Sequence, residues 1–108
     1  IIMTVTTLKT LPEFKDFVSK NPKVIIDCFA EWGGPCKFIS HRYHAMAEDP
    51  ANAAVKFIQI DVDANHSLTG YLKITAMPTF IAFSHCAEAQ SFSGASAENI
   101  QAMIASLK

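Results

Sequence analysis

The sequence lacks an apolar run long enough to cross a membrane, and it lacks an excess of charge of either sign. A membrane-spanning helix needs about 20 consecutive apolar residues, and no stretch of this chain approaches that length. Lys and Arg number 9 against 10 Asp and Glu, which gives a formal net charge of −1. Because nucleic-acid binding relies on clustered basic side chains, we expect neither a membrane nor a nucleic acid as a partner.

The first ten residues, IIMTVTTLKT, also lack the features of a secretory signal peptide. They contain no basic segment, no long apolar segment and no small-residue cleavage site. Ile1 and Ile2 precede Met3, and the sequence leaves open whether these two residues are native.

Cysteine is too scarce, and odd in number, for a disulfide framework. The chain contains three cysteines: Cys28, Cys36 and Cys86. They cannot all pair within one chain, so a reducing cytoplasmic setting is the better expectation.

The periodicity of apolar residues predicts one α/β domain over residues 1–108. A capping box at Thr10 and Glu13 begins a first helix, and KVIIDCFA is a strand that is apolar on both faces and therefore central. The remaining expected elements are a helix over 35–48, strands at 55–63, 79–85 and 90–94, a short helix at 67–74, a last helix from a Ser96 cap and an edge strand in TVTTL. This order predicts a central mixed sheet of four or five strands with helices on both faces.

Four segments give the chain a recognisable pattern: IIDCFAEWGGPCKFIS, DVDAN, YLKITAMPTF and FSGA with its closing helix. In their order and spacing they resemble the thioredoxin family over essentially the whole chain. The most specific parts are AEWxGPCK and the MPTF segment about forty residues later. The resemblance implies the thioredoxin fold and dithiol–disulfide exchange, and ITAMPTF is most similar to fungal and other eukaryotic cytosolic members.

The motif WGGPC departs from this family at the position that carries its chemistry. A dithiol reductase needs a thiolate at a helix N-terminus and a second thiol one turn later that resolves the mixed disulfide. By resemblance, Gly33 occupies the place of the attacking cysteine and Cys36 that of the resolving cysteine. We therefore expect reductase activity to be lost or reduced to slow monothiol exchange at Cys36. The sequence leaves open whether Gly33 is a natural divergence or an altered position.

Asp27 lies in the middle of the strand that should be buried on both faces. Burial of an unpaired carboxylate is costly and raises its pKa. By resemblance, Asp27 is the acid beneath the active site that takes a proton from Cys36.

The resemblance also implies a groove that receives an extended substrate segment. Pro78 matches the family's cis-proline, and the backbone of Met77 would pair with the substrate. The expected groove residues are Trp32, Gly34, Pro35, Ala76, Met77, Pro78 and Gly94. Expected partners are protein disulfides or extended peptides and a thioredoxin reductase. The alternative function is a non-catalytic module that holds a peptide or partner in this groove.

Other positions also depart from the family pattern. His41 stands where a helix-kinking proline is usual, so a straighter helix is expected, and the hairpin FSHCAEAQSF lacks a turn glycine, so its turn should be strained or rebuilt. Cys28 should be core filler. Cys86 should be exposed on the hairpin turn, so that a monomer, or a weak or disulfide-linked dimer through Cys36 or Cys86, is expected.

We expect no metal and no other cofactor. Cys36 and His44 share a helix but lie eight residues apart, which is about 12 Å along the axis. One ion cannot bridge that distance together with His41.

Overall fold

The computed structural model describes residues 4–31 and 34–108, so Ile1–Met3 lie outside the described residues. Within these ranges the chain forms a five-stranded sheet in the order β1–β3–β2–β4–β5. The strands are β1 (Val5–Thr7), β2 (Lys23–Phe29), β3 (Lys56–Asp61), β4 (Thr79–Ser84) and β5 (Ala87–Ser93). β1, β3 and β2 are parallel, whereas β4 runs antiparallel to β2 and to β5. The sheet is therefore mixed, with the apolar β2 at its centre, as predicted.

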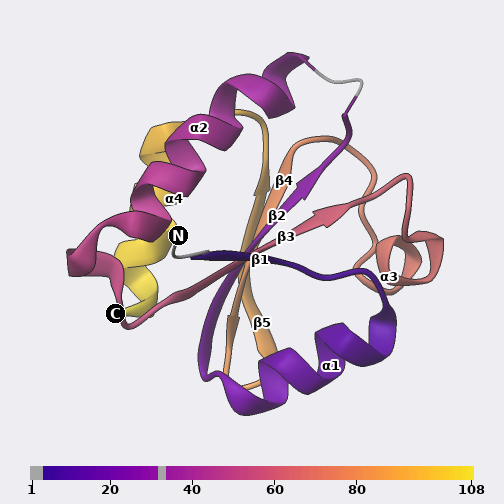
Figure 1. The fold of residues 1–108 in the computed structure, drawn as a ribbon, viewed down its shortest axis with the longest axis horizontal. Coiled ribbons are helices and arrows are strands. Elements are labelled where there is room, and N and C mark those ends of the chain that lie inside the picture. The colour runs from indigo at the N-terminus through magenta and orange to yellow at the C-terminus, as the bar shows by residue number, and fades with distance from the viewer. Residues whose placement is uncertain (1–3, 32–33) are drawn as a thin grey trace.

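Helices cover both faces of this sheet, as Figure 1 shows. The helices are α1 (Leu11–Lys20), α2 (Gly34–Glu48), α3 (His66–Tyr71) and α4 (Ala97–Leu107), with a short 3₁₀ helix, η1 (Pro50–Asn52). α1 and α3 pack on one face, and α2 and α4 pack on the other. None of the helices described is long and apolar enough to span a membrane.

Successive residues of β2 contribute to two separate cores, because side chains alternate between the faces of a strand. Ile26 and Cys28 pack beneath α1 and α3 together with Phe14. Ile25 packs beneath α2 and α4 together with Tyr43. Five consecutive residues of β2, from Val24 to Cys28, are buried, which explains why this strand reads as apolar on both faces.

Both ends of α1 are fixed by hydrogen bonds to side chains. At its start the Thr10 hydroxyl accepts from the Glu13 N–H at 3.1 Å, and the Glu13 carboxylate accepts from the Lys9 N–H at 3.0 Å. This confirms the predicted cap and satisfies N–H groups that have no partner within the helix.

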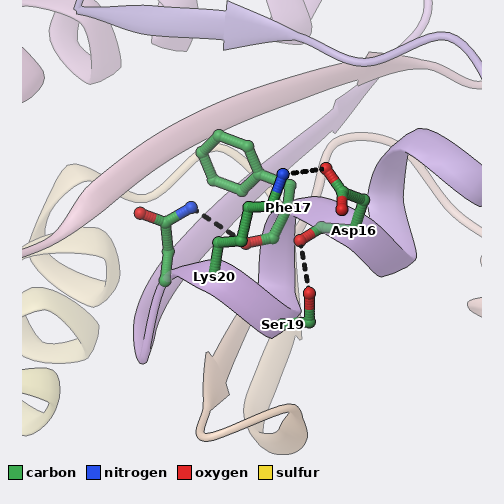
Figure 2. Close-up of polar contacts among 5 residues, drawn as sticks. Asp16, Phe17, Ser19 and Lys20 are labelled. Atoms are coloured by element: carbon green, nitrogen blue, oxygen red, sulfur yellow. Dashed lines mark hydrogen bonds and ion pairs between the residues drawn. The ribbon is translucent and has the colours of Figure 1, made fainter.

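Figure 2 shows the last turn of α1. The Lys20 ammonium pairs with the Asp16 carboxylate at 3.0 Å, and the Ser19 hydroxyl donates to the Asp16 carbonyl at 2.7 Å. The Asn21 amide donates to the Phe17 carbonyl at 2.9 Å. The Ser19 and Asn21 side chains thus add donors to backbone carbonyl groups of the last turn, and the ion pair links side chains one turn apart.

The hairpin between β4 and β5 differs from the prediction. Its second strand begins at Ala87, whereas the sequence pattern placed it at 90–94. Nearly all of β5 is exposed, so it shows no alternation of apolar and polar residues that would mark its beginning. The turn consists of His85 and Cys86, whose φ angles are 50° and 69°. Of the two outcomes expected without a turn glycine, strained or rebuilt, this is the strained one, because two-residue hairpin turns need positive φ at both positions and here two residues with side chains adopt it.

Candidate functional site

Cys36 lies in the first turn of α2, behind Gly34 and Pro35, which are exposed. Proline fits here because the first helical N–H groups have no partner within the helix. The side chain of Cys36 is buried, with 3% exposure. His41 lies within α2, which runs uninterrupted from Gly34 to Glu48. Trp32 and Gly33, the two remaining residues expected at this helix start, lie outside the described residues.

Asp27 is buried in β2, with 1% exposure. It lies two residues from Ile25 and so faces α2, the helix that carries Cys36. Neither carboxylate oxygen has a hydrogen-bond partner among residues 4–31 and 34–108. Burial raises the pKa of Asp27 from 3.8 to about 7, because a charged carboxylate loses its hydration there. The predicted burial and the direction of the pKa shift are both confirmed.

Cys28 is fully buried in the core beneath α1 and α3, on the opposite face of the sheet from Asp27. Burial, and to a lesser degree the nearby charge of Asp27, raise the pKa of this thiol far above its ordinary value. The prediction that Cys28 fills the core is confirmed.

The structure brings together the residues around Pro78. The Met77–Pro78 peptide bond is cis, in agreement with the sequence resemblance. The Gly94 N–H donates to the Pro78 carbonyl at 2.9 Å, and Gly94 has a φ of 109°, which favours glycine. The Thr79 hydroxyl donates to the Ala76 carbonyl. Pro78 and Gly94 are therefore adjacent, and their role in binding a substrate stays a prediction.

Cys36 also lines a cleft that the sequence did not predict. The cleft has a volume of about 500 Å³ and is lined by Phe29, Ala30, Glu31, Cys36, Lys37, Ser40, His44 and Gln59. A chain of side-chain hydrogen bonds holds one wall: His44 Nε2 lies 3.2 Å from Gln59 Oε1, and Gln59 Nε2 donates to the Thr7 hydroxyl at 2.9 Å. The sequence signal for it was Gln59, a polar residue between the apolar Ile58 and Ile60 of β3.

Cys86 is exposed at the tip of the β4–β5 hairpin, as predicted, and its thiol donates to the Val18 carbonyl at 3.3 Å. Over the part of the chain that the structure describes, no three His, Cys, Asp or Glu side chains are grouped so that they could hold a metal ion.

Comparisons with known proteins agree with this arrangement. The sequence profile named Thioredoxin matches residues 5–106. Thioredoxin from Malassezia sympodialis is 32% identical over 100 residues, which cover 93% of this chain and 95% of the relative. The solved structure of Plasmodium falciparum thioredoxin superposes with a TM-score of 0.90 at 31% identity, and the match covers 95% of this chain and 99% of that one. Mitochondrial thioredoxin 3 from Saccharomyces cerevisiae, in its oxidised form, superposes with a TM-score of 0.89 at 30% identity, covering 95% of each chain.

Proposed function

The chain belongs to the thioredoxin family, whose members are disulfide oxidoreductases, and we propose that Gly33 prevents it from completing dithiol reduction. By resemblance to the family, Gly33 in the WGGPC motif stands where the attacking cysteine would be. Glycine has no group that can attack a disulfide. The covalent intermediate that Cys36 would resolve then does not form.

The positions of the other two thiols support this proposal. Cys28 lies on the opposite face of the sheet from α2, and Cys86 lies at the exposed hairpin tip. Neither is placed to assist Cys36 in a two-thiol cycle. The observation that carries the proposal is therefore a single buried thiol, Cys36, at the start of α2, with glycine at position 33, three residues before it.

The remaining chemistry in this proposal is slow monothiol exchange at Cys36. Asp27, which faces α2 and has a pKa of about 7, is the group proposed to take the proton of this thiol. A mixed disulfide formed at Cys36 would persist, because no second thiol is available to release it.

A second candidate function is a binding module without turnover. The adjacency of Pro78 and Gly94 favours it, since the family's peptide groove is built there. Under this proposal an extended peptide pairs with the backbone of Met77. The groove would be completed by Trp32, Gly34, Pro35 and Ala76. Protein disulfides, and a thioredoxin reductase acting in the cytoplasm, are the partners that the family suggests.

Insulin reduction in the presence of a small dithiol, followed by turbidity, separates these possibilities from an active reductase. The chain should give a rate near the background of the dithiol alone. Calorimetric titration with an extended peptide then tests the groove, and binding without reduction would support the module. Rapid reduction that disappears in Cys36→Ser would contradict the proposed loss of activity.

A further inference from the structure

The cleft beside Cys36 lies at one edge of the sheet, where its three parallel strands end. β1, β3 and β2 end at Thr7, Asp61 and Phe29. Parallel strands direct their carboxyl ends to the same edge, and ligands of open α/β sheets bind at that edge. The location is therefore a common one for a small-molecule site.

This cleft continues into a second one, of about 380 Å³. The two clefts share Phe29, Glu31 and Gln59, and the second extends to Lys9 and Asn65. We call the pair the strand-end groove. Neither cleft is lined by Pro78 or Gly94, so the groove approaches Cys36 by a route different from the proposed peptide groove.

The walls of the strand-end groove carry complementary polar groups. Lys37 and Ser40 line the groove from the α2 side and carry an ammonium and a hydroxyl group that can donate hydrogen bonds. At the far end, Asn65 is 7% exposed and its Nδ2 donates to the Asp61 carbonyl at 2.9 Å. Carboxylates also line the groove: Glu31 borders both clefts and Asp61 borders the second, and each can accept a hydrogen bond from an N–H group.

The size of the cleft and the burial of Cys36 restrict what can react. Volumes of about 300–1,000 Å³ are typical of small-molecule sites, and the cleft beside Cys36 falls within that range. A thiol with 3% exposure is poorly placed to meet a disulfide held on the surface of a folded protein. A small disulfide fits a cleft of this size and can reach Cys36, because Cys36 lines the cleft.

We propose that the strand-end groove binds a small disulfide bearing carboxylates and amide N–H groups, and presents it to Cys36. Such a molecule places a carboxylate near Lys37 and an N–H group near Glu31 or Asp61. The inference rests on the proposed function, because it assigns a substrate class to the residual exchange at Cys36.

The reaction is a thiol–disulfide exchange. The Cys36 thiol gives up its proton, and the thiolate attacks one sulfur of the small disulfide. A bond forms between Cys36 and that sulfur while the original sulfur–sulfur bond breaks, and the departing thiolate takes up a proton. The product is a mixed disulfide on the protein and one free small thiol.

Glutathione disulfide is the probe for this proposal. The reduced chain is freed of reductant and mixed with the probe, and mass spectrometry with peptide mapping follows the adduct on Cys36. Ser40→Phe fills the cleft and should slow this adduct about tenfold, which is about 1.4 kcal/mol in activation free energy. Ala45→Phe is the matched control, because Ala45 is exposed on the same helix and does not line the cleft.

Lys37→Glu tests the charge without disturbing the core, since Lys37 is exposed. It should slow the reaction of glutathione disulfide about threefold, in line with a surface charge pair, and leave the uncharged 2-hydroxyethyl disulfide unaffected. Circular dichroism checks the fold of each variant, and Lys37→Glu keeps the test valid if Ser40→Phe does not fold.

Equal rates for Ser40→Phe and Ala45→Phe, where both fold, would overturn the proposal. So would the absence of an adduct on the unaltered chain, or slowing by Ala76→Trp in place of the groove variants. These outcomes are independent of insulin reduction, which tests the loss of dithiol activity. The two proposals can therefore fail separately.

Discussion

The hydroxyl of Tyr43 on α2 donates to the carbonyl oxygen of Ile58 on β3 at 2.7 Å, inside a fully buried core. The same hydroxyl lies 2.9 Å from the Ile25 carbonyl on β2. One side chain thus joins the helix that carries Cys36 to the two central parallel strands. Burial also raises the pKa of this phenol well above its ordinary value, so it acts as a donor at neutral pH.

Tyr43→Phe should therefore destabilise the fold. The variant keeps the ring, which contacts Phe57 and Phe80, and removes only the donor to the two carbonyl groups. The expected cost is about 1–3 kcal/mol of unfolding free energy, which is typical when a buried acceptor loses its partner. Urea denaturation measures it.

Tyr71→Phe is the control for this measurement, because Tyr71 is 52% exposed. Its unfolding free energy should stay within about 0.5 kcal/mol of the unaltered chain. If both substitutions lowered the unfolding free energy equally, the buried hydroxyl would not be stabilising the packing of α2 against the sheet.

Asp27→Asn should stabilise the protein most at high pH. The pKa of Asp27 is raised on folding from 3.8 to about 7, so the unfolded chain releases this proton more readily than the folded chain. The contribution of Asp27 to stability is full below pH 3.8 and falls as the pH rises toward 7. Above that pH the burial of the charged carboxylate costs up to about 4 kcal/mol, because a tenfold change in proton affinity corresponds to about 1.4 kcal/mol.

Thermal unfolding of the unaltered chain and of Asp27→Asn across this pH range tests the linkage. The stability difference between them should grow with pH and level off above about pH 7. Asp16→Asn is a suitable control, since Asp16 is exposed on α1. A difference that does not change with pH would contradict the raised pKa of Asp27.

The sequence predicted best those features that burial marks with a pattern of apolar and polar residues along the chain. A charged residue between Ile26 and Cys28 stands out in an apolar strand, and the structure confirms that Asp27 is buried. The caps at Thr10 and Ser96 were also predicted from the sequence, because a short polar side chain before a helix accepts a hydrogen bond from an N–H group of the first turn.

Features that form only when distant segments pack together, or that lie on an exposed edge, could not be predicted from the sequence. The start of β5 was misplaced because an exposed edge strand has no apolar face to mark it. The strand-end groove was missed because its residues come from β2, β3 and α2 and meet only after the parallel strands align. No local pattern connects Ser40 with Gln59.

Cys86→Gly should stabilise the β4–β5 hairpin. Cys86 has a φ of 69°, a conformation that costs side-chain-bearing residues about 1 kcal/mol and glycine almost nothing. A gain of up to about 1 kcal/mol is expected, less the contribution of the thiol contact with Val18. Chemical denaturation measures the gain.

Cys86→Ser provides the matched comparison, because it removes the thiol and keeps a side chain at the same position. It should show no gain in stability. Both variants should abolish any covalent dimer that forms through Cys86, as seen on a non-reducing gel. Equal stability of the two variants would argue that the turn carries no strain at this position.

Gly33→Cys should restore insulin reduction. The substitution supplies the thiol that attacks a substrate disulfide, and Cys36 then resolves the mixed disulfide. Because loss of a nucleophile typically costs several orders of magnitude in rate, the restored activity should exceed that of the unaltered chain by at least about a hundredfold. Insulin turbidity with a small dithiol as the electron source measures it.

Two further variants identify the group responsible for this activity. Gly33→Ser adds a side chain without a thiol, and its rate should stay at background. Gly33→Cys combined with Cys36→Ser should attack a substrate and remain bound to it, because the resolving thiol is absent. A covalent complex that dissociates on addition of reductant would identify position 33 as the site of attack. If Gly33→Ser restored the rate as well as Gly33→Cys did, the missing feature at position 33 would be a side chain and not a nucleophile.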